Sequence, residues 1–338
     1  MAENSKIEWC DHTFNPWIGC TKISPACDNC YAERFGKRIG VKWGTGAERR
    51  RTSISNWKQP KRWNRKAEIA HKAWEKFKAT HPGLTDSDLE EAGFIKPRRP
   101  RVFCASLADV FDNAISPKWR YELFDLISKT RYLDWLLLTK RIGNADQMIM
   151  DAIPEIDKAG IEWPPSNVWL GITICNQAEA DRDIPKLLSV PAAKRFLSIE
   201  PMLGPIDLAQ SCAKYRWIDF DGVECCAMPR RLDWVICGGE TGKNARPMHP
   251  YWPSRLRNQC NAASVPFFFK QWGEWRPRSG TAWDEWVMEN GSRYSGAFDT
   301  RQHLESVLPD DSCGIEKVGK KAAGRLLDGR EWNEVPPS

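Results

Sequence analysis

Three cysteines near the N-terminus, Cys20, Cys27 and Cys30, lie within eleven residues and have the spacing best suited to chemistry in this chain. Thiolates are soft ligands that hold iron or zinc. Three of them in one loop leave a fourth coordination position open. In a [4Fe–4S] cluster with three cysteine ligands, the free iron can bind S-adenosylmethionine and pass it an electron, which produces a carbon radical. The loop therefore predicts an iron–sulfur site.

Other uses of these cysteines stay open at the level of sequence. A structural zinc site needs four ligands, and Cys10, His12 or a distant cysteine could supply the fourth. Simple buried thiols are a further alternative. Disulfides are disfavoured, because the chain opens with Met-Ala-Glu-Asn-Ser and shows no apolar signal segment. We expect a cytoplasmic protein with reduced thiols. No uninterrupted apolar run reaches the length of a membrane span, so we expect no contact with a membrane.

A basic segment with interleaved tryptophans, residues 37–66, is the second feature. It holds eleven Lys or Arg residues against one acid, Glu48. Basic groups release counterions from phosphates and flat rings stack on bases, so the segment predicts contact with DNA, or else with RNA or a nucleotide. A solvated basic face whose tryptophans enter the core is the alternative. The contacts that we predict are Arg49, Arg50, Arg51, Trp57, Lys61 and Arg62.

Short apolar runs recur along the 338-residue chain and alternate with amphipathic stretches. Several runs are almost continuously apolar, as in strands buried on both faces of a parallel sheet. The predicted strands are 7–18, 101–106, 135–139, 168–174, 195–199, 234–237 and 265–269, and the predicted helices are 65–92, 117–130, 143–152, 177–188 and 251–263. This alternation predicts an α/β protein with βα units wound into a partial or complete TIM-type barrel.

Polar residues follow each predicted strand, where the chemistry of such barrels gathers. Gly238 and Gly239 precede Glu240, so the backbone there can approach a ligand while the carboxylate accepts hydrogen bonds from an amine or a ribose hydroxyl. Glu200 precedes Pro201, which favours an extended backbone with the carboxylate aimed into the barrel mouth. A buried carboxylate there needs a cation. The candidates are Lys140, Arg141, Arg246 and Lys270.

Several ordered motifs together resemble the phage-associated three-Cys-motif proteins, a radical-SAM-like family of phages and prophages. The resemblance spans nearly the whole chain. Its motifs are Phe14-Asn-Pro-Trp17-Ile-Gly-Cys20, Cys27-Asp-Asn-Cys30-Tyr31-Ala32, Ser106-Leu-Ala-Asp109, Leu138-Thr-Lys140-Arg141, Leu197-Ser-Ile-Glu200-Pro201, Gly238-Gly-Glu240, Ala245-Arg246-Pro247-Met248, Phe267-Phe-Phe-Lys270-Gln271-Trp272-Gly273 and Ala322-Ala-Gly-Arg325-Leu-Leu-Asp328-Gly-Arg330. It implies a barrel of the radical S-adenosylmethionine type, with Cys20, Cys27 and Cys30 as ligands of a [4Fe–4S] cluster.

The cysteine loop departs from the usual pattern of that superfamily, because its first gap has six residues where three are usual. Asn29 stands where an aromatic residue usually packs on adenine, so Tyr31 is the candidate for that contact. The Gly-Gly-Glu element follows the sixth predicted strand, where the superfamily usually has it after the second. The S-adenosylmethionine contacts that we predict are Tyr31, Ser106, Asp109, Thr173, Asn176, Ser198, Gly238 and Gly239.

These observations predict one domain over residues 1–275 with insertions at about 37–100 and 208–232, followed by an extension over 276–338 that packs on it. The predicted function is a radical S-adenosylmethionine enzyme in which Glu200, Lys270 and Glu240 are catalytic. Its expected substrate is a nucleic acid base, in phage DNA modification, and its expected electron donor is a protein such as flavodoxin or ferredoxin. The alternative is a nucleic-acid-binding protein with a structural zinc or a non-catalytic cluster.

Overall fold

The structure is a computed structural model that describes residues 2–152, 164–213, 217–218, 224–225, 232–277, 285–295 and 313–337. Most of the predicted insertion at 208–232 lies outside these residues, as do Cys226 and Trp283. No helix in the described part is both long and apolar enough to cross a membrane.

One eight-stranded sheet organises the chain, and its strand order is β1-β2-β5-β6-β7-β8-β11-β12. The two-residue β1 is antiparallel to β2, and the other seven strands run parallel. Each of the seven predicted ranges overlaps one of the seven parallel strands, whereas β1 was not predicted. The bounds of the eight strands are Ala2–Glu3 (β1), His12–Phe14 (β2), Arg101–Cys104 (β5), Asp134–Thr139 (β6), Val168–Thr173 (β7), Lys194–Ile199 (β8), Trp234–Gly238 (β11) and Phe267–Gln271 (β12).

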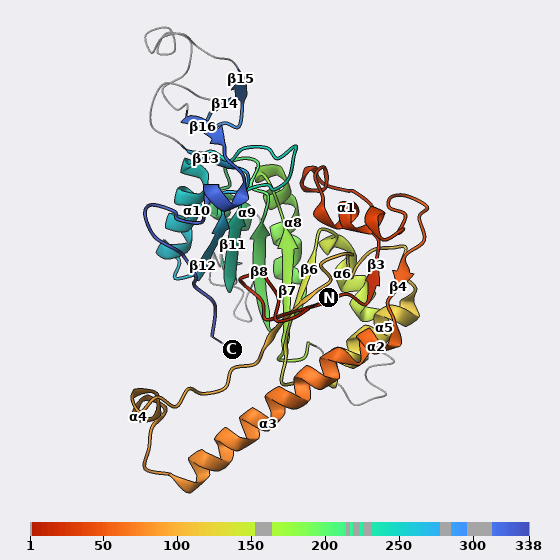
Figure 1. The fold of residues 1–338 in the computed structure, drawn as a ribbon, viewed down its shortest axis with the longest axis vertical. Coiled ribbons are helices and arrows are strands. Elements are labelled where there is room, and N and C mark those ends of the chain that lie inside the picture. The colour runs from red at the N-terminus through yellow and green to blue at the C-terminus, as the bar shows by residue number, and fades with distance from the viewer. Residues whose placement is uncertain are drawn as a thin grey trace.

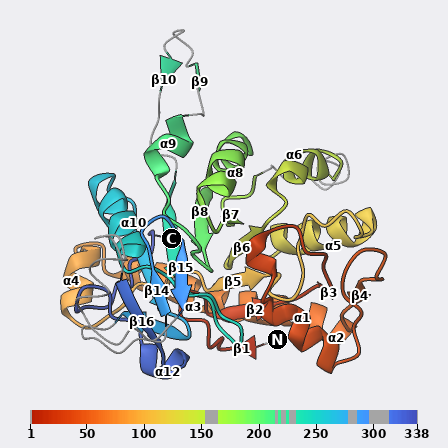
Figure 2. The same cartoon turned by 90° about the horizontal axis from the view of Figure 1, so that it is seen from above.

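The prediction of a TIM-type barrel of the radical SAM kind is wrong. In the described residues β12 pairs with β11 and β2 pairs with β5 and β1, and no strand joins β12 to β2 or β1. The sheet is therefore curled but open. Figure 2 shows the helices that cover its outer face. They are Pro117–Ser128 (α5), Ile142–Met150 (α6), Gln177–Ser189 (α8) and Tyr251–Ala262 (α10), at the predicted places.

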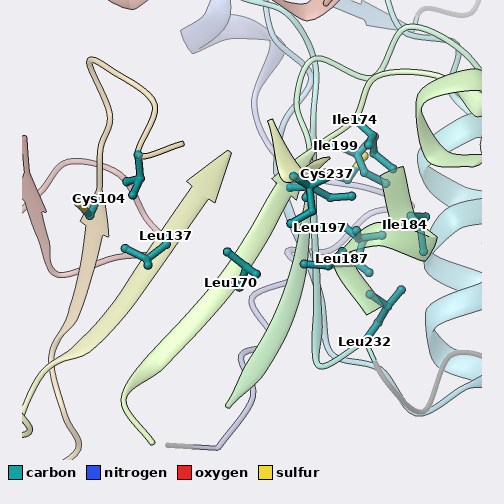
Figure 3. Close-up of a cluster of buried hydrophobic side chains, with 14 of the residues drawn as sticks. Cys104, Leu137, Leu170, Ile174, Ile184, Leu187, Leu197, Ile199, Leu232 and Cys237 are labelled. Atoms are coloured by element: carbon teal, nitrogen blue, oxygen red, sulfur yellow. The ribbon is translucent and has the colours of Figure 1, made fainter. Parts of the chain in front are cut away.

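Along each strand the side chains point alternately to the two faces of the sheet, so the two faces build two cores. Cys104, Leu137 and Leu170 face the helices and are paired in register across β5, β6 and β7. Figure 3 shows them in a row with the side chains that α8 contributes. The inner face carries large aromatic rings instead. These rings are Phe103, Trp169, Phe196, Trp234 and Phe268.

The two ends of the chain fill the gap that the open sheet leaves. Trp9, which precedes β2, is 2% exposed and packs against Phe103 and Trp234, at ring centroid distances of 4.6 and 6.3 Å. From the C-terminal tail, Asn333 forms an antiparallel bridge with Phe268, and the carbonyl of Glu334 accepts a hydrogen bond from the Trp234 indole at 2.8 Å. Apolar packing from both termini thus takes the place of a closing strand pair.

After α1 (Tyr31–Arg38), the predicted insertion at about 37–100 forms β4 (Arg50–Arg51), which pairs with β3 (Trp17–Ile18), and three helices, α2 (Ile54–Trp57), α3 (Gln59–Thr80) and α4 (Asp86–Glu91). The predicted helix over 65–92 is therefore two helices, and the first begins earlier. Figure 1 shows α3 projecting away from the sheet with α4 near its far end. Only the first part of α3 reaches the core, and Ile69 farther along the helix is 61% exposed.

The remaining elements lie around the loops of the sheet. The extension forms a small antiparallel sheet of order β13-β16-β14-β15. The bounds are Pro25–Cys27 (a 3-10 helix), Tyr31–Arg38 (α1), Leu208–Ala213 (α9), Trp217–Ile218 (β9), Glu224–Cys225 (β10), Trp275–Pro277 (β13), Glu285–Val287 (β14), Arg293–Ser295 (β15), Cys313–Lys317 (β16) and Lys320–Ala323 (α12).

A buried carboxylate begins β6, at the end of the sheet opposite the cysteine loop. Asp134 is 0% exposed, and neither of its oxygens accepts a hydrogen bond from the described residues. The Arg99 Nε lies 2.9 Å from Oδ1 without the alignment of a hydrogen bond. Burial raises the pKa of Asp134 to about 6, although Arg99, Lys194 and Arg101 partly offset the effect.

Asp134 should make the protein less stable as pH rises. Its folded pKa of about 6 lies above the unfolded value of about 3.9, so the folded state binds more protons between these pH values. Stability should therefore fall by about 2–3 kcal/mol from this group between pH 4 and pH 7. The substitution Asp134→Asn should remove that part of the pH dependence. Urea unfolding of both proteins across this range measures the difference, and parallel stability curves would contradict the assignment.

Candidate functional site

A cavity of about 350 Å³ opens where the parallel strands end, beside the cysteine loop. Its volume lies in the range of small-molecule sites. Its apolar lining includes three side chains of the inner core, Trp9, Phe103 and Leu138. The polar lining comes from the cysteine loop and from the ends of six strands. The predicted site residues that line the cavity are Cys20, Cys27, Cys30, Tyr31, Ser106, Asp109, Thr173, Ser198, Glu200, Gly239, Glu240 and Lys270.

Two predicted cofactor contacts do not line this cavity. Asn176 caps helix α8, where its side-chain oxygen accepts a hydrogen bond from the backbone N–H of Glu179 at 3.0 Å. This is the ordinary structural use of an asparagine before a helix. Gly238 lies inside β11, and its carbonyl accepts a hydrogen bond from the N–H of Met202. The predictions for Asn176 and Gly238 therefore do not hold in this structure.

The cysteine loop has a defined local structure. Ser24 caps a 3-10 helix, Pro25–Cys27, by accepting a hydrogen bond from the Ala26 N–H, and Cys30 directly precedes α1. Burial raises the pKa of the Cys20 thiol to about 12, with Asp109 and Asp112 adding to the rise and Arg141 opposing it. Cys20 would therefore bind a metal as a thiolate only if the metal displaces its proton, which is released to water.

The three cysteines of the loop lie along one cavity. No three His, Cys, Asp or Glu side chains in the described residues are grouped closely enough for one metal ion, yet Cys20, Cys27 and Cys30 line one cavity. A zinc ion with bonds of about 2.3 Å to sulfur would draw its thiolates to within about 4 Å of one another. A [4Fe–4S] cluster binds each thiolate through a different iron and spreads its ligands more widely. Ten cysteines of the described part, these three among them, are free thiols.

A hydrogen-bonded clamp joins the cysteine loop to the loop after β11. Arg246 donates to both oxygens of Glu240, from Nη2 at 2.5 Å and from Nε at 2.9 Å, and its Nη1 reaches Asp28 at 2.9 Å. The amide of Asn29 donates to Glu240 and to the Asn244 carbonyl, each at 2.9 Å. Burial alone would raise the pKa of Glu240, but these donors outweigh it and lower the pKa. Glu240 therefore acts as an anchor for the cysteine loop.

The clamp also explains the unusual residue before the last cysteine. Asn29 occupies the position where we expected an aromatic ring, and its amide is fully used in holding Glu240 and Asn244. Tyr31, one step beyond Cys30, lines the cavity and donates from its hydroxyl to the Ser106 carbonyl at 2.7 Å. The sequence signal for this clamp was the short Ala245-Arg246 motif after Glu240, but spacing alone did not show where Arg246 points.

Glu200 and Lys270 form an ion pair in the cavity wall. The Lys270 Nζ lies 2.9 Å from both carboxylate oxygens, and the Gln271 amide donates to Oε1 at 3.0 Å. Their side chains are 20% and 14% exposed, so both groups face the cavity without being sealed from it. The pairing agrees with the predicted need of Glu200 for a cation, and it comes from the end of β12.

Two other predicted contacts have structural partners. The Asp109 carboxylate accepts hydrogen bonds from the Thr139 hydroxyl at 2.7 Å and from the N–H groups of Phe111 and Lys140. It ties the loop after β5 to the end of β6. At Gly239 an added Cβ would lie 1.9 Å from the carbonyl oxygen of Trp272. This glycine is required by the neighbouring backbone, whereas we predicted a close approach to a ligand.

The predicted nucleic-acid contacts separate into buried and exposed side chains. Arg49 is 4% exposed, pairs with Asp112 at 2.8 Å and donates to the Thr21 hydroxyl, so it supports the cysteine loop and cannot contact phosphate. Trp57 packs edge-on against Phe14 and lies under the guanidinium of Arg51. Neither Arg49 nor Trp57 is free to contact DNA as predicted.

Exposed cations remain on one face of α3. Lys58, Lys61, Arg62 and Arg65 are exposed and have no ion-pair partner among the described residues. Their spacing of i, i+3, i+4 and i+7 places them on one helix face. We name these four residues the α3 basic stripe. Of the remaining predicted contacts, Arg50 donates to the Ile39 carbonyl and Arg51 pairs with Glu122.

Comparison with known proteins gives a family without an assigned activity. A family model described as "Protein of unknown function (DUF5131)" matches residues 4–336. No curated protein and no solved structure matches the chain.

The clamp leads to a stability prediction. Replacing Arg246 with glutamine leaves the Glu240 carboxylate, 5% exposed, without its cation and should cost about 3 kcal/mol in the free energy of unfolding. Amide hydrogen exchange in residues 24–30 should accelerate. The control Arg255→Gln breaks a pair that is 59% and 34% exposed and should cost at most about 1 kcal/mol. Equal costs, or unchanged exchange in the cysteine loop, would show that the clamp does not anchor it.

Proposed function

As the chain belongs to the DUF5131 family, whose function is unknown, we propose from its own site that it is a radical S-adenosylmethionine enzyme acting on a nucleic acid base. The observation that carries the proposal is that Cys20, Cys27 and Cys30 line one cavity together with unpaired hydroxyls and an ion pair. The proposal rests on this site and makes no use of a barrel fold.

Cys20, Cys27 and Cys30 would hold a [4Fe–4S] cluster. When bound, such a cluster supplies an electron to S-adenosylmethionine and so gives access to a carbon radical. Three ligands from one anchored loop suit this use, because a closed four-ligand site has no free position for a cofactor. An electron donor such as flavodoxin or ferredoxin is part of the proposal.

Two hydroxyls on neighbouring strands are suited to the polar parts of the cofactor. Thr173 at the end of β7 and Ser198 near the end of β8 are paired in register, and both line the cavity. Neither hydroxyl has a hydrogen-bond partner among the described residues. Side-by-side hydroxyls can donate to and accept from a ribose or an amine. Tyr31 is the aromatic candidate for contact with adenine, and Ser106 lies beside it.

The Glu200–Lys270 pair is the best candidate for proton handling on the substrate. Lys270 can donate and Glu200 can accept, and each stays partly exposed to the cavity. The pair could hold or move one proton at an amine or hydroxyl of a bound base. Trp9, Phe103 and Leu138 exclude water from the opposite wall, which a radical reaction requires.

The α3 basic stripe supports a nucleic acid as the larger substrate. A hydrogen-bonded chain connects α2, which directly precedes α3, to the cavity: the Asn56 amide donates to the Asn15 carbonyl, and the Asn15 amide donates to the Ser106 hydroxyl. An enzyme that acts on a base in duplex DNA must take that base out of the stack and into a pocket. The resemblance to three-Cys-motif proteins favours DNA modification in a phage-infected cell, with the host cytoplasm as the place of action.

Anaerobic reconstitution tests the enzyme proposal. The wild type should bind about four iron atoms per chain, turn brown, and release 5′-deoxyadenosine when given dithionite and S-adenosylmethionine. The variant Cys27→Ala should lose the iron and the reaction. Cys313→Ala is the control, because Cys313 is also a free thiol but does not line the cavity. It should retain both.

The competing function would give a different result. A colourless wild type with one tightly held zinc would support a nucleic-acid-binding protein and overturn the enzyme proposal. Full iron content in Cys27→Ala would overturn the ligand assignment.

Binding to DNA should depend on the α3 basic stripe. The double variant Lys61→Gln/Arg62→Gln should bind duplex DNA more weakly, and the slope of log K against log salt should fall in magnitude by about 2, because two phosphate contacts are lost. The control Lys186→Gln/Arg255→Gln removes one charge from α8 and one from α10, outside the stripe, and should leave the slope unchanged. Fluorescence anisotropy between 50 and 200 mM salt, about the range over which such slopes are measured, provides the test. An unchanged slope in the stripe variant would exclude the stripe as the contact surface.

A further inference from the structure

The carboxylates that line the cavity all have partners. Glu240 is held by Arg246, and Glu200 is held by Lys270. Asp109 accepts three hydrogen bonds, from the Thr139 hydroxyl and two backbone N–H groups. These carboxylates are therefore all paired within the protein before any ligand binds.

The cations of the cavity are in excess. Five line it, of which Lys22 pairs with Glu33 and Lys270 with Glu200. The other three are Lys140, Arg141 and Lys320, and none has a carboxylate within ion-pair distance among the described residues. Lys140 is half-buried at the end of β6, and Lys320 begins α12 in the extension.

Arg141 has a donor that nothing accepts. Its Nη2 donates to the Thr21 carbonyl at 2.9 Å, which fixes the guanidinium beside the cysteine loop. Its Nε is buried and has no hydrogen-bond partner among the described residues. Buried donors are almost always paired, so an unpaired one that lines a cavity points to an acceptor supplied by a ligand.

We propose that Lys140, Arg141 and Lys320 form an oxyanion subsite that takes the phosphate of a nucleotide substrate. The proposal rests on the proposed function and specifies its substrate: the reacting unit enters the cavity with a phosphate attached. A guanidinium with two ammonium groups matches the charge and the several acceptor oxygens of a phosphate. A lone carboxylate, such as the one in S-adenosylmethionine, shares this chemistry but would neutralise only one of three positive charges.

Binding of small probes to the as-purified protein tests the subsite without need of a cluster. Each of the four deoxynucleoside 5′-monophosphates is compared with its nucleoside by calorimetry. In the wild type at least one monophosphate should bind about 10- to 100-fold more tightly than its nucleoside, as expected for charge-assisted hydrogen bonds. In Lys140→Gln/Lys320→Gln this advantage should disappear. Both lysines lack partners, so their replacement leaves no buried group unpaired, and thermal melting confirms folding.

Controls and a second ligand separate the outcomes. Lys76→Gln removes an exposed charge on α3 and should keep the full phosphate advantage. The single variant Lys140→Arg, which keeps Lys320, should retain most of the phosphate advantage. No advantage in the wild type, or one that persists in the double variant, would overturn the subsite. Weaker binding of S-adenosylmethionine to the reconstituted double variant, with nucleotide binding unchanged, would assign the cations to the cofactor and overturn the phosphate assignment.

The two proposals can fail separately. A wild type that takes up no iron but prefers monophosphates would end the radical enzyme proposal and leave the phosphate subsite standing. A wild type that cleaves S-adenosylmethionine but binds nucleosides and monophosphates equally would support the radical enzyme proposal and overturn the phosphate subsite.

Discussion

The clamp of Glu240 and Arg246 connects two ends of a sheet that no strand pairing connects. Glu240 follows β11, the second strand from one edge, whereas Asp28 and Asn29 belong to the loop that follows β2 and β3 near the other edge. Because the sheet is open, side chains must hold these loops together. The buried carboxylate needs its guanidinium, and that need fixes where the cysteine loop lies. The cavity has its shape because this contact spans it.

The inner core determines the floor of the same cavity. An added Cβ on Gly171 would lie 2.3 Å from the ring of Phe196, so this glycine allows the ring to lie flat on β7. Trp169 and Trp234 pack edge to face beside it, and Trp9 completes the layer from outside the sheet. Such a tightly filled layer leaves room for a ligand only above it, where the strands end. The aromatic layer below the cavity and the polar groups around it therefore both follow from the alternation of side chains along the strands.

The strands were predictable from sequence because apolar runs buried on both faces are distinctive at the scale of five or six residues. Closure was not predictable, since it depends on whether β12 meets β2, and the gap is filled instead by Trp9 and by the tail around Glu334. Strand-end position correctly brought most candidates to one cavity. It could not distinguish a ligand contact from a structural one. The Asp109 carboxylate and the Arg49 guanidinium, for example, both bind other groups of the protein.

The charges that remain unpaired are more informative about function than those that are paired. Glu240, Asp109 and Arg49 bind neighbouring groups of the protein, and these contacts position loops. Lys140 and Arg141 come from the same strand end as the partners of Asp109, yet their side chains pair with no carboxylate of the described residues. An unpaired guanidinium donor in a half-buried wall is costly for the folded protein and becomes favourable only when an acceptor arrives. The cavity is therefore electrostatically prepared for a negatively charged ligand beside the cysteine loop, which a site meant only to hold a metal in a closed shell would not require.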